Sequence, residues 1–133
     1  MYTQKVIDRF TNPKNVGQIK GANGVGTVGN AACGDIMKVY IKVENNIITD
    51  AKFKTFGCAA AISSTDVAMD LIKDKTIDEA LKVTNKDVLN ELDELPTQKI
   101  HCSILAQEAI GAAVADYHKR LAREEAKRKK GNN

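Results

Sequence analysis

Apolar and polar residues alternate most regularly in the middle of the chain, between residues 36 and 56. Two such runs, Ile36–Val43 and Ile47–Phe56, flank Glu44-Asn45-Asn46, a good tight turn. A period of two is typical of half-buried strands, and a weaker, glycine-rich strand is expected at Val25–Val28. Sequential strands with short turns predict an antiparallel meander with one face open to water. The inward positions would be Met37, Val39, Ile41, Val43, Ala51, Phe53 and Thr55.

Helical patterns lie on both sides of these strands. Thr76-Ile77-Asp78-Glu79 has the form of a capping box, which predicts a helix start. Pro96 disfavours helix in the residue before it, so Leu95–Lys99 is expected to be extended. We expect helices at residues 3–11, 59–73, 77–83, 84–92 and about 103–123, the last burying Leu105, Ala109, Ala112, Ala113 and Leu121.

Composition is ordinary for a globular protein, with 43% hydrophobic and 28% charged residues in 133. That length predicts one domain, residues 1–125, followed by a basic tail at 126–133 that we expect to be a frayed helix end. The N-terminus lacks the apolar run of a signal peptide, and no stretch approaches the ~20 apolar residues of a membrane span. The sequence therefore predicts a cytoplasmic protein without a membrane partner. The net charge of +3 and the lack of a basic and aromatic stripe argue against a nucleic-acid partner.

All three cysteines of the chain lie in settings that suit a metal site. The settings are Ala32-Cys33-Gly34-Asp35, Phe56-Gly57-Cys58 and Ile100-His101-Cys102-Ser103. In a reducing compartment, cysteines more often bind metals or catalyse reactions than form disulfides. If the three thiols converge, they form a soft, anionic pocket that can hold iron, zinc or sulfur.

The expected topology brings two of these cysteines to the same end of the sheet. Cys33 precedes the second strand and Cys58 follows the third, and these antiparallel neighbours lie about 4.8 Å apart. Cys58 and Cys102 each precede an expected helix, whose N-terminus lowers a thiol pKa and suits a thiolate. Asp35 adds a hard oxygen donor and His101 a nitrogen donor, so the set exceeds what one tetrahedral metal needs. A site with more donors than one metal needs, and with donors of different kinds, suggests that the metal is exchanged and is not a permanent structural metal.

Other interpretations remain at this point. A single cysteine also fits a small buried apolar residue. A zinc-binding structural or regulatory protein and a thiol enzyme such as a sulfurtransferase are the competing classes. A structural zinc site would more simply use Cys-x-x-Cys pairs, which this chain lacks, and an enzyme would have only His101 as a nearby base.

Several segments, spaced along nearly the whole chain from Tyr2 to Lys119, closely resemble the signatures of the IscU/NifU iron–sulfur cluster scaffold family. The similar segments are Asn12-Pro13-Lys14-Asn15-Val16-Gly17, Ala32-Cys33-Gly34-Asp35-Ile36-Met37-Lys38, Phe53-Lys54-Thr55-Phe56-Gly57-Cys58 and Lys99-Ile100-His101-Cys102-Ser103-Ile104-Leu105-Ala106. The resemblance implies an α+β fold, with a small three-stranded antiparallel sheet packed by several helices and a long C-terminal helix.

The resemblance also implies a function: assembly of an iron–sulfur cluster, expected to be 2Fe–2S, and its transfer to apo iron–sulfur recipient proteins, without enzymatic activity. Cys33, Cys58 and Cys102 match the cluster ligands. Asp35 matches the aspartate that keeps the cluster labile, and His101 the alternative ligand. Sulfur would come as persulfide from a cysteine desulfurase, with Cys102 the first choice of acceptor and Cys33 the second. The cluster-free site would bind Fe(II) or Zn(II).

Two departures bear on the partners and the branch of the family. Leu95-Pro96-Thr97-Gln98-Lys99 stands where many IscU proteins carry Leu-Pro-Pro-Val-Lys, which puts a DnaK-type chaperone partner in doubt. His101 argues against the SufU-type branch, which lacks a histidine there and binds zinc tightly. A homodimer stays open, since Tyr2 and the first helix could pack within one chain or on a second subunit.

Overall fold

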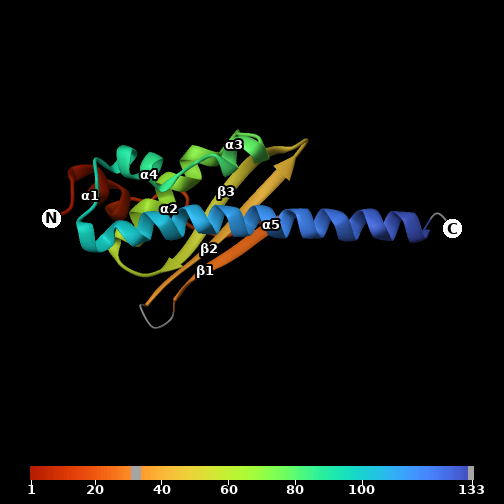
Figure 1. Cartoon of the computed structure of the whole chain (residues 1–133), viewed down its shortest axis with the longest axis horizontal. Helices are drawn as coiled ribbons and strands as arrows, with labels where there is room; N and C mark the ends of the chain where they lie inside the picture. The colour runs from red at the N-terminus through yellow and green to blue at the C-terminus, as the bar shows by residue number, and fades with distance from the viewer. Residues whose placement is uncertain (31–33, 132–133) are drawn as a thin grey trace.

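A three-stranded antiparallel sheet forms the middle of the molecule, as the computed structural model of residues 1–30 and 34–131 shows (Figure 1). The strands β1 (Gly24–Asn30), β2 (Asp35–Glu44) and β3 (Ile47–Phe56) lie in sequence order. Asn45 and Asn46 connect β2 to β3 with φ angles of 53° and 66°, the left-handed conformation that two-residue hairpins favour. The expected meander is confirmed.

Burial alternates along β2 as the sequence predicts, and one face of the sheet packs against helices. The helix α5 (Ile100–Gly131) lies over β1 and β2, and α2 (Ala59–Ile72) lies over β3. The apolar core fills the space between these two helices and the sheet. The opposite face carries lysines and is open to water, and Thr55, expected to be inward, is partly exposed. The core residues on β2 and β3 are Met37, Val39, Ile41, Val43, Ile48, Ala51 and Phe53.

Glycines in β1 allow α5 to approach the sheet closely. A Cβ atom at Gly26 would lie 2.3 Å from the backbone nitrogen of Ala113, closer than real Cβ contacts come. The glycines that weaken the strand pattern in the sequence therefore have a packing role, because they let a helix backbone rest on the strand.

Three shorter helices complete the fold: α1 (Gln4–Thr11), α3 (Ile77–Leu81) and α4 (Asn85–Leu92). Thr76 begins α3 with the expected capping box. Arg9 joins α1 to α2 through ion pairs with Asp66, which is fully buried, and with Asp70. These contacts place the N-terminal segment against the helix that begins next to Cys58.

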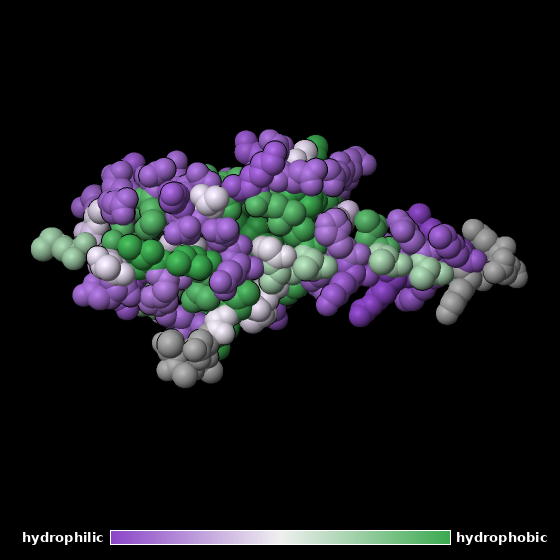
Figure 2. All heavy atoms as spheres, in the orientation of Figure 1, coloured by the Kyte–Doolittle hydropathy of each residue, from purple (hydrophilic) through white to green (hydrophobic). Residues whose placement is uncertain are grey.

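The C-terminal region differs from the expectation in three respects. Thr97–Lys99 forms a 3-10 turn, η1, in place of an extended segment. The helix α5 follows directly, so it begins at Ile100, three residues before the expected start, and continues to Gly131. Leu121, expected to be buried, is 37% exposed, and the C-terminal part of α5 projects past the end of the sheet (Figures 1 and 2). None of the described helices combines the length and apolar character needed to cross a membrane.

Candidate metal and cluster site

Asp35 is placed by the pairing of β2 with β3. It is the first residue of β2, and the next residue, Ile36, pairs with Phe56 at the end of β3. The Asp35 side chain is therefore next to Gly57 and is 10% exposed. A Cβ at Gly57 would lie 2.6 Å from Asp35 Oδ1. The space that this glycine leaves free is thus occupied by the carboxylate.

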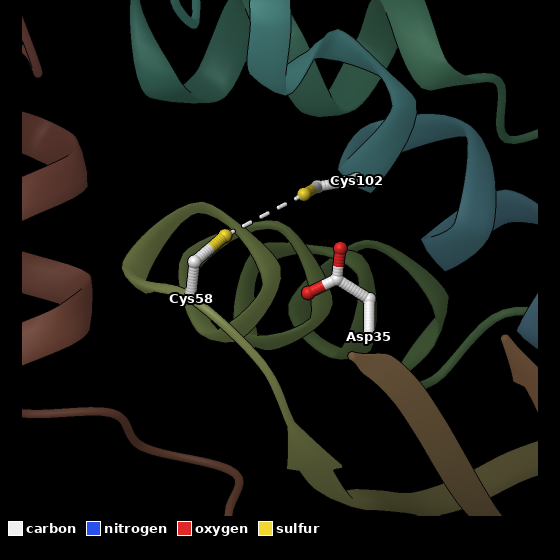
Figure 3. A group of neighbouring side chains, drawn as sticks. All are labelled: Asp35, Cys58 and Cys102. Atoms are coloured by element: carbon white, nitrogen blue, oxygen red, sulfur yellow. Dashed lines mark hydrogen bonds between the residues drawn. The ribbon is translucent and has the colours of Figure 1, made fainter. Parts of the chain in front are cut away.

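Cys58 is the N-cap residue of α2, and its side chain makes no capping hydrogen bond. Its Sγ lies 3.8 Å from Cys102 Sγ, and the two thiols point toward one another beside the Asp35 carboxylate (Figure 3). The sequence separation of these cysteines is 44 residues, so their meeting depends on the packing of α5 beside α2. The expected convergence of Cys58 and Cys102 is present in the fold.

His101 connects the buried thiol to the carboxylate. Its Nε2 atom lies 3.1 Å from Asp35 Oδ2 and 3.7 Å from Cys102 Sγ, while Nδ1 lies 3.1 Å from the carbonyl oxygen of Gln98. When the neutral ring carries its hydrogen on Nδ1, it donates to Gln98, and the Nε2 lone pair faces the other donors. That is the arrangement by which a second contact orients a histidine toward a metal.

The donor atoms are close enough to share one ion. Ligand atoms of Asp35, Cys58 and Cys102 all lie within 4.8 Å of one another. Ligands of a tetrahedral ion bound at about 2.0–2.3 Å are separated by roughly 3.3–3.8 Å, so small side-chain rotations suffice. His101, which contacts Asp35 and Cys102, adds a nitrogen to these two sulfurs and one oxygen, a mixture that suits iron or zinc. Of the five predicted ligands, Asp35, Cys58 and Cys102 form the close group and His101 borders it, while Cys33 lies outside the described residues.

The Cys102 thiol does not have the lowered pKa expected at a helix start. It lies inside the first turn of α5 and is fully buried, and burial is the main cause that raises its pKa to about 12. The neighbouring Cys58 and Asp35 raise it further, while Lys99 opposes them. The expectation is wrong because removal from water outweighs the helix dipole. A metal that binds Cys102 must displace its proton.

Lys99 is a member of this environment that the sequence analysis did not single out. The pKa of its ammonium group is raised, first by the charge of Cys58 and then by Tyr2, with smaller contributions from Cys102 and Asp35. Lys99 therefore lies within electrostatic reach of both thiols and opposes the rise in the pKa of Cys102. The available signal was its position two residues before His101, within the same motif.

Comparison with known proteins agrees with the resemblance found in the sequence. The model of the NifU-like N terminal domain family matches residues 1–124. The iron–sulfur cluster assembly scaffold protein IscU 1 of Archaeoglobus fulgidus is 55% identical over 120 residues, which cover 90% of this chain and 78% of that protein. The IscU scaffold protein of Escherichia coli strain K12 is 52% identical over 120 residues, covering 87% and 93%.

A solved structure supports the fold. The crystal structure of a candidate iron–sulfur cluster assembly scaffold protein for the SUF system, from Fervidobacterium islandicum, superposes with a TM-score of 0.73. The two chains are 26% identical, and the match covers 84% of this chain and 95% of the other. With the sequence matches and the meander packed by α2 and α5, this similarity confirms the α+β architecture. The chain belongs to the family of NifU-like N-terminal domains, and its relatives include the IscU scaffold proteins.

Proposed function

We propose that this protein is a scaffold on which iron–sulfur clusters are assembled and from which they pass to apo-proteins. The observation that carries the proposal is the meeting of Cys58 and Cys102 with Asp35 and His101, from three separate parts of a chain more than half identical to IscU scaffold proteins. Two thiols provide the soft ligands that iron–sulfur clusters require. The protein acts as a carrier with no turnover of its own, in a reducing compartment such as the cytoplasm.

The mixed donor set supports a temporary cluster. A carboxylate binds iron less softly than a thiolate, so Asp35 weakens retention where a fourth cysteine would strengthen it. We propose a 2Fe–2S cluster held by Cys33, Cys58 and Cys102, with Asp35 or His101 as the remaining ligand. Before cluster assembly, the same donors bind Fe(II) or Zn(II). The role of Cys33 in this set rests on the sequence resemblance alone.

Sulfur would arrive from a cysteine desulfurase as a persulfide. The accepting thiolate attacks the outer sulfur, the donor's S–S bond breaks, and the donor cysteine leaves as a thiolate. Cys102 stays our first choice of acceptor and Cys33 the second. Because Cys102 is buried and its pKa is raised to about 12, it can accept sulfur only after metal binding or a shift of the α5 start removes its proton.

The decisive experiment is anaerobic reconstitution with Fe(II), cysteine and a cysteine desulfurase. We expect visible absorption of an iron–sulfur cluster and equal amounts of iron and sulfide, as 2Fe–2S requires. Replacing Cys33, Cys58 or Cys102 singly by Ser should sharply reduce the cluster yield. An undiminished spectrum would remove that cysteine from the ligand set, and no cluster on the wild-type protein would contradict the proposal.

The competing function, a protein in which zinc holds the fold together, makes a different prediction. Of the described site donors, Cys102 belongs to the apolar core between the sheet, α2 and α5, and Cys58 packs against that core from its edge. Because most of this core is made of residues outside the site, we expect it to stand without a metal, and chelator should leave the helical circular dichroism nearly unchanged. Unfolding on metal removal would favour the structural zinc protein.

The segment that a DnaK-type chaperone would recognise is folded in this structure. Leu95 is buried, and Thr97–Lys99 form the 3-10 turn that leads into α5. With the departure from the family motif, this argues that cluster release proceeds without such a chaperone. Transfer of the cluster to an apo-ferredoxin at the same rate with and without the chaperone would support this view.

A further inference from the structure

The open face of the sheet places two lysines directly opposite one another. Lys38 of β2 pairs with Lys54 of β3 in the strand register, and both side chains are exposed. Like charges that face each other across two strands destabilise a sheet. No Asp or Glu among the described residues forms an ion pair with either lysine; Lys38 Nζ lies 5.4 Å from the Tyr40 ring centre, and Lys54 Nζ donates to Gln18 Oε1. The fold thus bears a repulsion that a negative partner would relieve.

An exposed apolar pair lies beside these lysines, toward the candidate site. Ile36 is 39% exposed and Phe56 is 79% exposed, and the two residues are directly opposite in the register. Each is adjacent in sequence to the site: Ile36 follows Asp35, and Phe56 precedes Gly57-Cys58. An exposed aromatic residue such as Phe56, with an apolar neighbour and lysines next to it, is typical of a protein interface.

Lys52 extends the positive charge along the same face. It pairs with Tyr40, one step further from the site than the Lys38–Lys54 pair, and is partly exposed. The nearest acidic residue along this face, Asp50, lies beyond Lys52, where it pairs with Lys42. At the end of the sheet that borders the donor group, this face therefore carries an apolar pair followed by lysines. At the far end it carries both a positive and a negative side chain.

We propose that this surface, made of Ile36, Phe56, Lys38, Lys54 and Lys52, is the docking site for an acidic apo-protein that receives the cluster. The inference rests on the proposed scaffold function. A recipient of a 2Fe–2S cluster has to bring its own cysteines up to the donor group, and an acidic surface around its empty site would complement the three lysines. Lysines on the sheet face whose end adjoins the site would steer such a recipient toward it.

The test uses the full chain loaded with cluster from Fe(II) and inorganic sulfide, so that no desulfurase is required, and an acidic apo-ferredoxin as the recipient. The variant Lys38→Glu/Lys54→Glu reverses the facing charges, and Lys38→Gln/Lys54→Gln removes them more mildly. The control Lys127→Glu/Lys129→Glu makes the same change in net charge on the projecting part of α5, away from the site (Figure 1). The second-order rate constant of transfer is measured at low and high salt.

We expect the Glu double variant to slow transfer about tenfold or more at low salt, with a smaller difference at high salt, while the α5 control stays near wild type. Phe56→Ser should slow transfer at both salt concentrations, because an apolar contact is not screened. Cluster content and half-life without recipient should not change in any variant. Unaltered transfer in the Lys and Phe56 variants, or an equal loss in the α5 control, would overturn the docking proposal.

Two further outcomes would reassign the surface. If desulfurase-driven assembly slows while transfer does not, the occupant is the sulfur donor and the proposal is wrong. If analytical ultracentrifugation shows that the variants turn a dimer into a monomer while transfer is unaffected, the occupant is a second copy of the chain. That result would also contradict the docking proposal. Failure of the wild-type protein to assemble any cluster would instead reject the scaffold function, so the two failures are distinguishable.

Discussion

The imidazole Nε2 of His101, in the first turn of α5, lies 3.1 Å from the carboxylate Oδ2 of Asp35, the first residue of β2. The two residues are 66 positions apart, so the contact joins the start of the long helix to the start of the central strand. Any ion bound between Cys58 and Cys102 would be beside both. This pair of non-sulfur donors is the feature that most distinguishes the site from a permanent metal site made only of cysteines.

Replacing Asp35 by Ala should lengthen the life of a bound cluster. The carboxylate is the least soft donor of the group, so its removal leaves the iron to softer ligands. We expect a half-life several-fold longer, measured as the decay of visible absorption after reconstitution. Asp50→Ala, on β3 away from the site, is the control, and equal half-lives for the Asp35 variant and the wild-type protein would contradict this role.

Gly57→Ala should disturb the site from its backbone side. The new Cβ would lie 2.6 Å from Asp35 Oδ1 and 3.1 Å from Ala61 Cβ, so the carboxylate has to move. We expect a loss of about 1–3 kcal/mol in the free energy of unfolding, together with an altered cluster half-life. Gly111→Ala in α5 is the matched control: nothing lies within 4 Å of its Cβ position, and it should gain about 0.5–1 kcal/mol. Urea titration of both variants measures the difference, and equal effects would refute the steric argument.

Ser64 and Ser63 are adjacent fully buried serines of α2 for which opposite effects are expected. Ser64 Oγ has no hydrogen-bond partner among the described residues, whereas Ser63 Oγ donates to the carbonyl oxygen of Val6. Ser64→Ala removes an unsatisfied hydroxyl and should leave stability unchanged or raise it by up to about 1–2 kcal/mol. Ser63→Ala should cost about 1 kcal/mol. The midpoints of urea unfolding of the two variants measure these effects. A larger loss of stability for Ser64→Ala than for Ser63→Ala would show that the Ser64 hydroxyl has a partner.

The ion pair between α1 and α2 predicts a loss of stability in acid. Burial raises the pKa of Asp70, but hydrogen bonds from Arg9 and Asn15 and the charges of Arg9 and Lys73 outweigh it and hold the pKa below the ordinary 3.8. A carboxyl group with a lowered folded-state pKa stabilises the protein above the unfolded-state value. Its contribution is therefore full above about pH 4 and is lost as the pH falls below 3.8 through the folded-state pKa.

Asp70→Asn tests this prediction through the pH dependence of stability. The variant should be less stable than the wild-type protein at pH 7, and the difference in stability should shrink below pH 3.8. The midpoints of urea unfolding, measured at pH 7 and again below pH 3.8, test this. Asp78→Asn, an exposed carboxyl in α3, serves as the comparison. A difference that stays constant with pH would mean that the charge of Asp70 does not contribute.

The strands and most helices were predictable because their signals are local. The bounds Ile47–Phe56 agree with the structure, and the capping box at Thr76 begins α3 as expected. The segment around Pro96 was misjudged, because proline restricts the residue before it but leaves the residues after it free to turn into η1 and α5. Leu121 was wrongly placed in the core, because helical periodicity does not show where the sheet beneath a helix ends.

The candidate site was predictable in its members and less so in its properties. Strand order and turn length predicted that Cys33 and Cys58 lie at one end of the sheet; Cys33 is outside the described residues, and Asp35, two residues later, lies there next to Gly57. The pKa of Cys102 was not accessible from the sequence, since it depends on burial by segments distant along the chain. The same is true of Gly57, where the absence of a Cβ leaves space that the Asp35 carboxylate occupies.

The sequence by itself determined the meander, the helices that follow it, the family and the residues that could bind a cluster. These features follow from patterns in which each residue acts with near neighbours or through a recurring motif. Only the tertiary structure decided that Cys102 is buried with a raised pKa, that His101 connects Asp35 to Cys102, and that Lys38 faces Lys54 on an uncovered surface. The physical reason is that desolvation and charge interaction depend on distances in space, which packing sets between residues far apart in the chain.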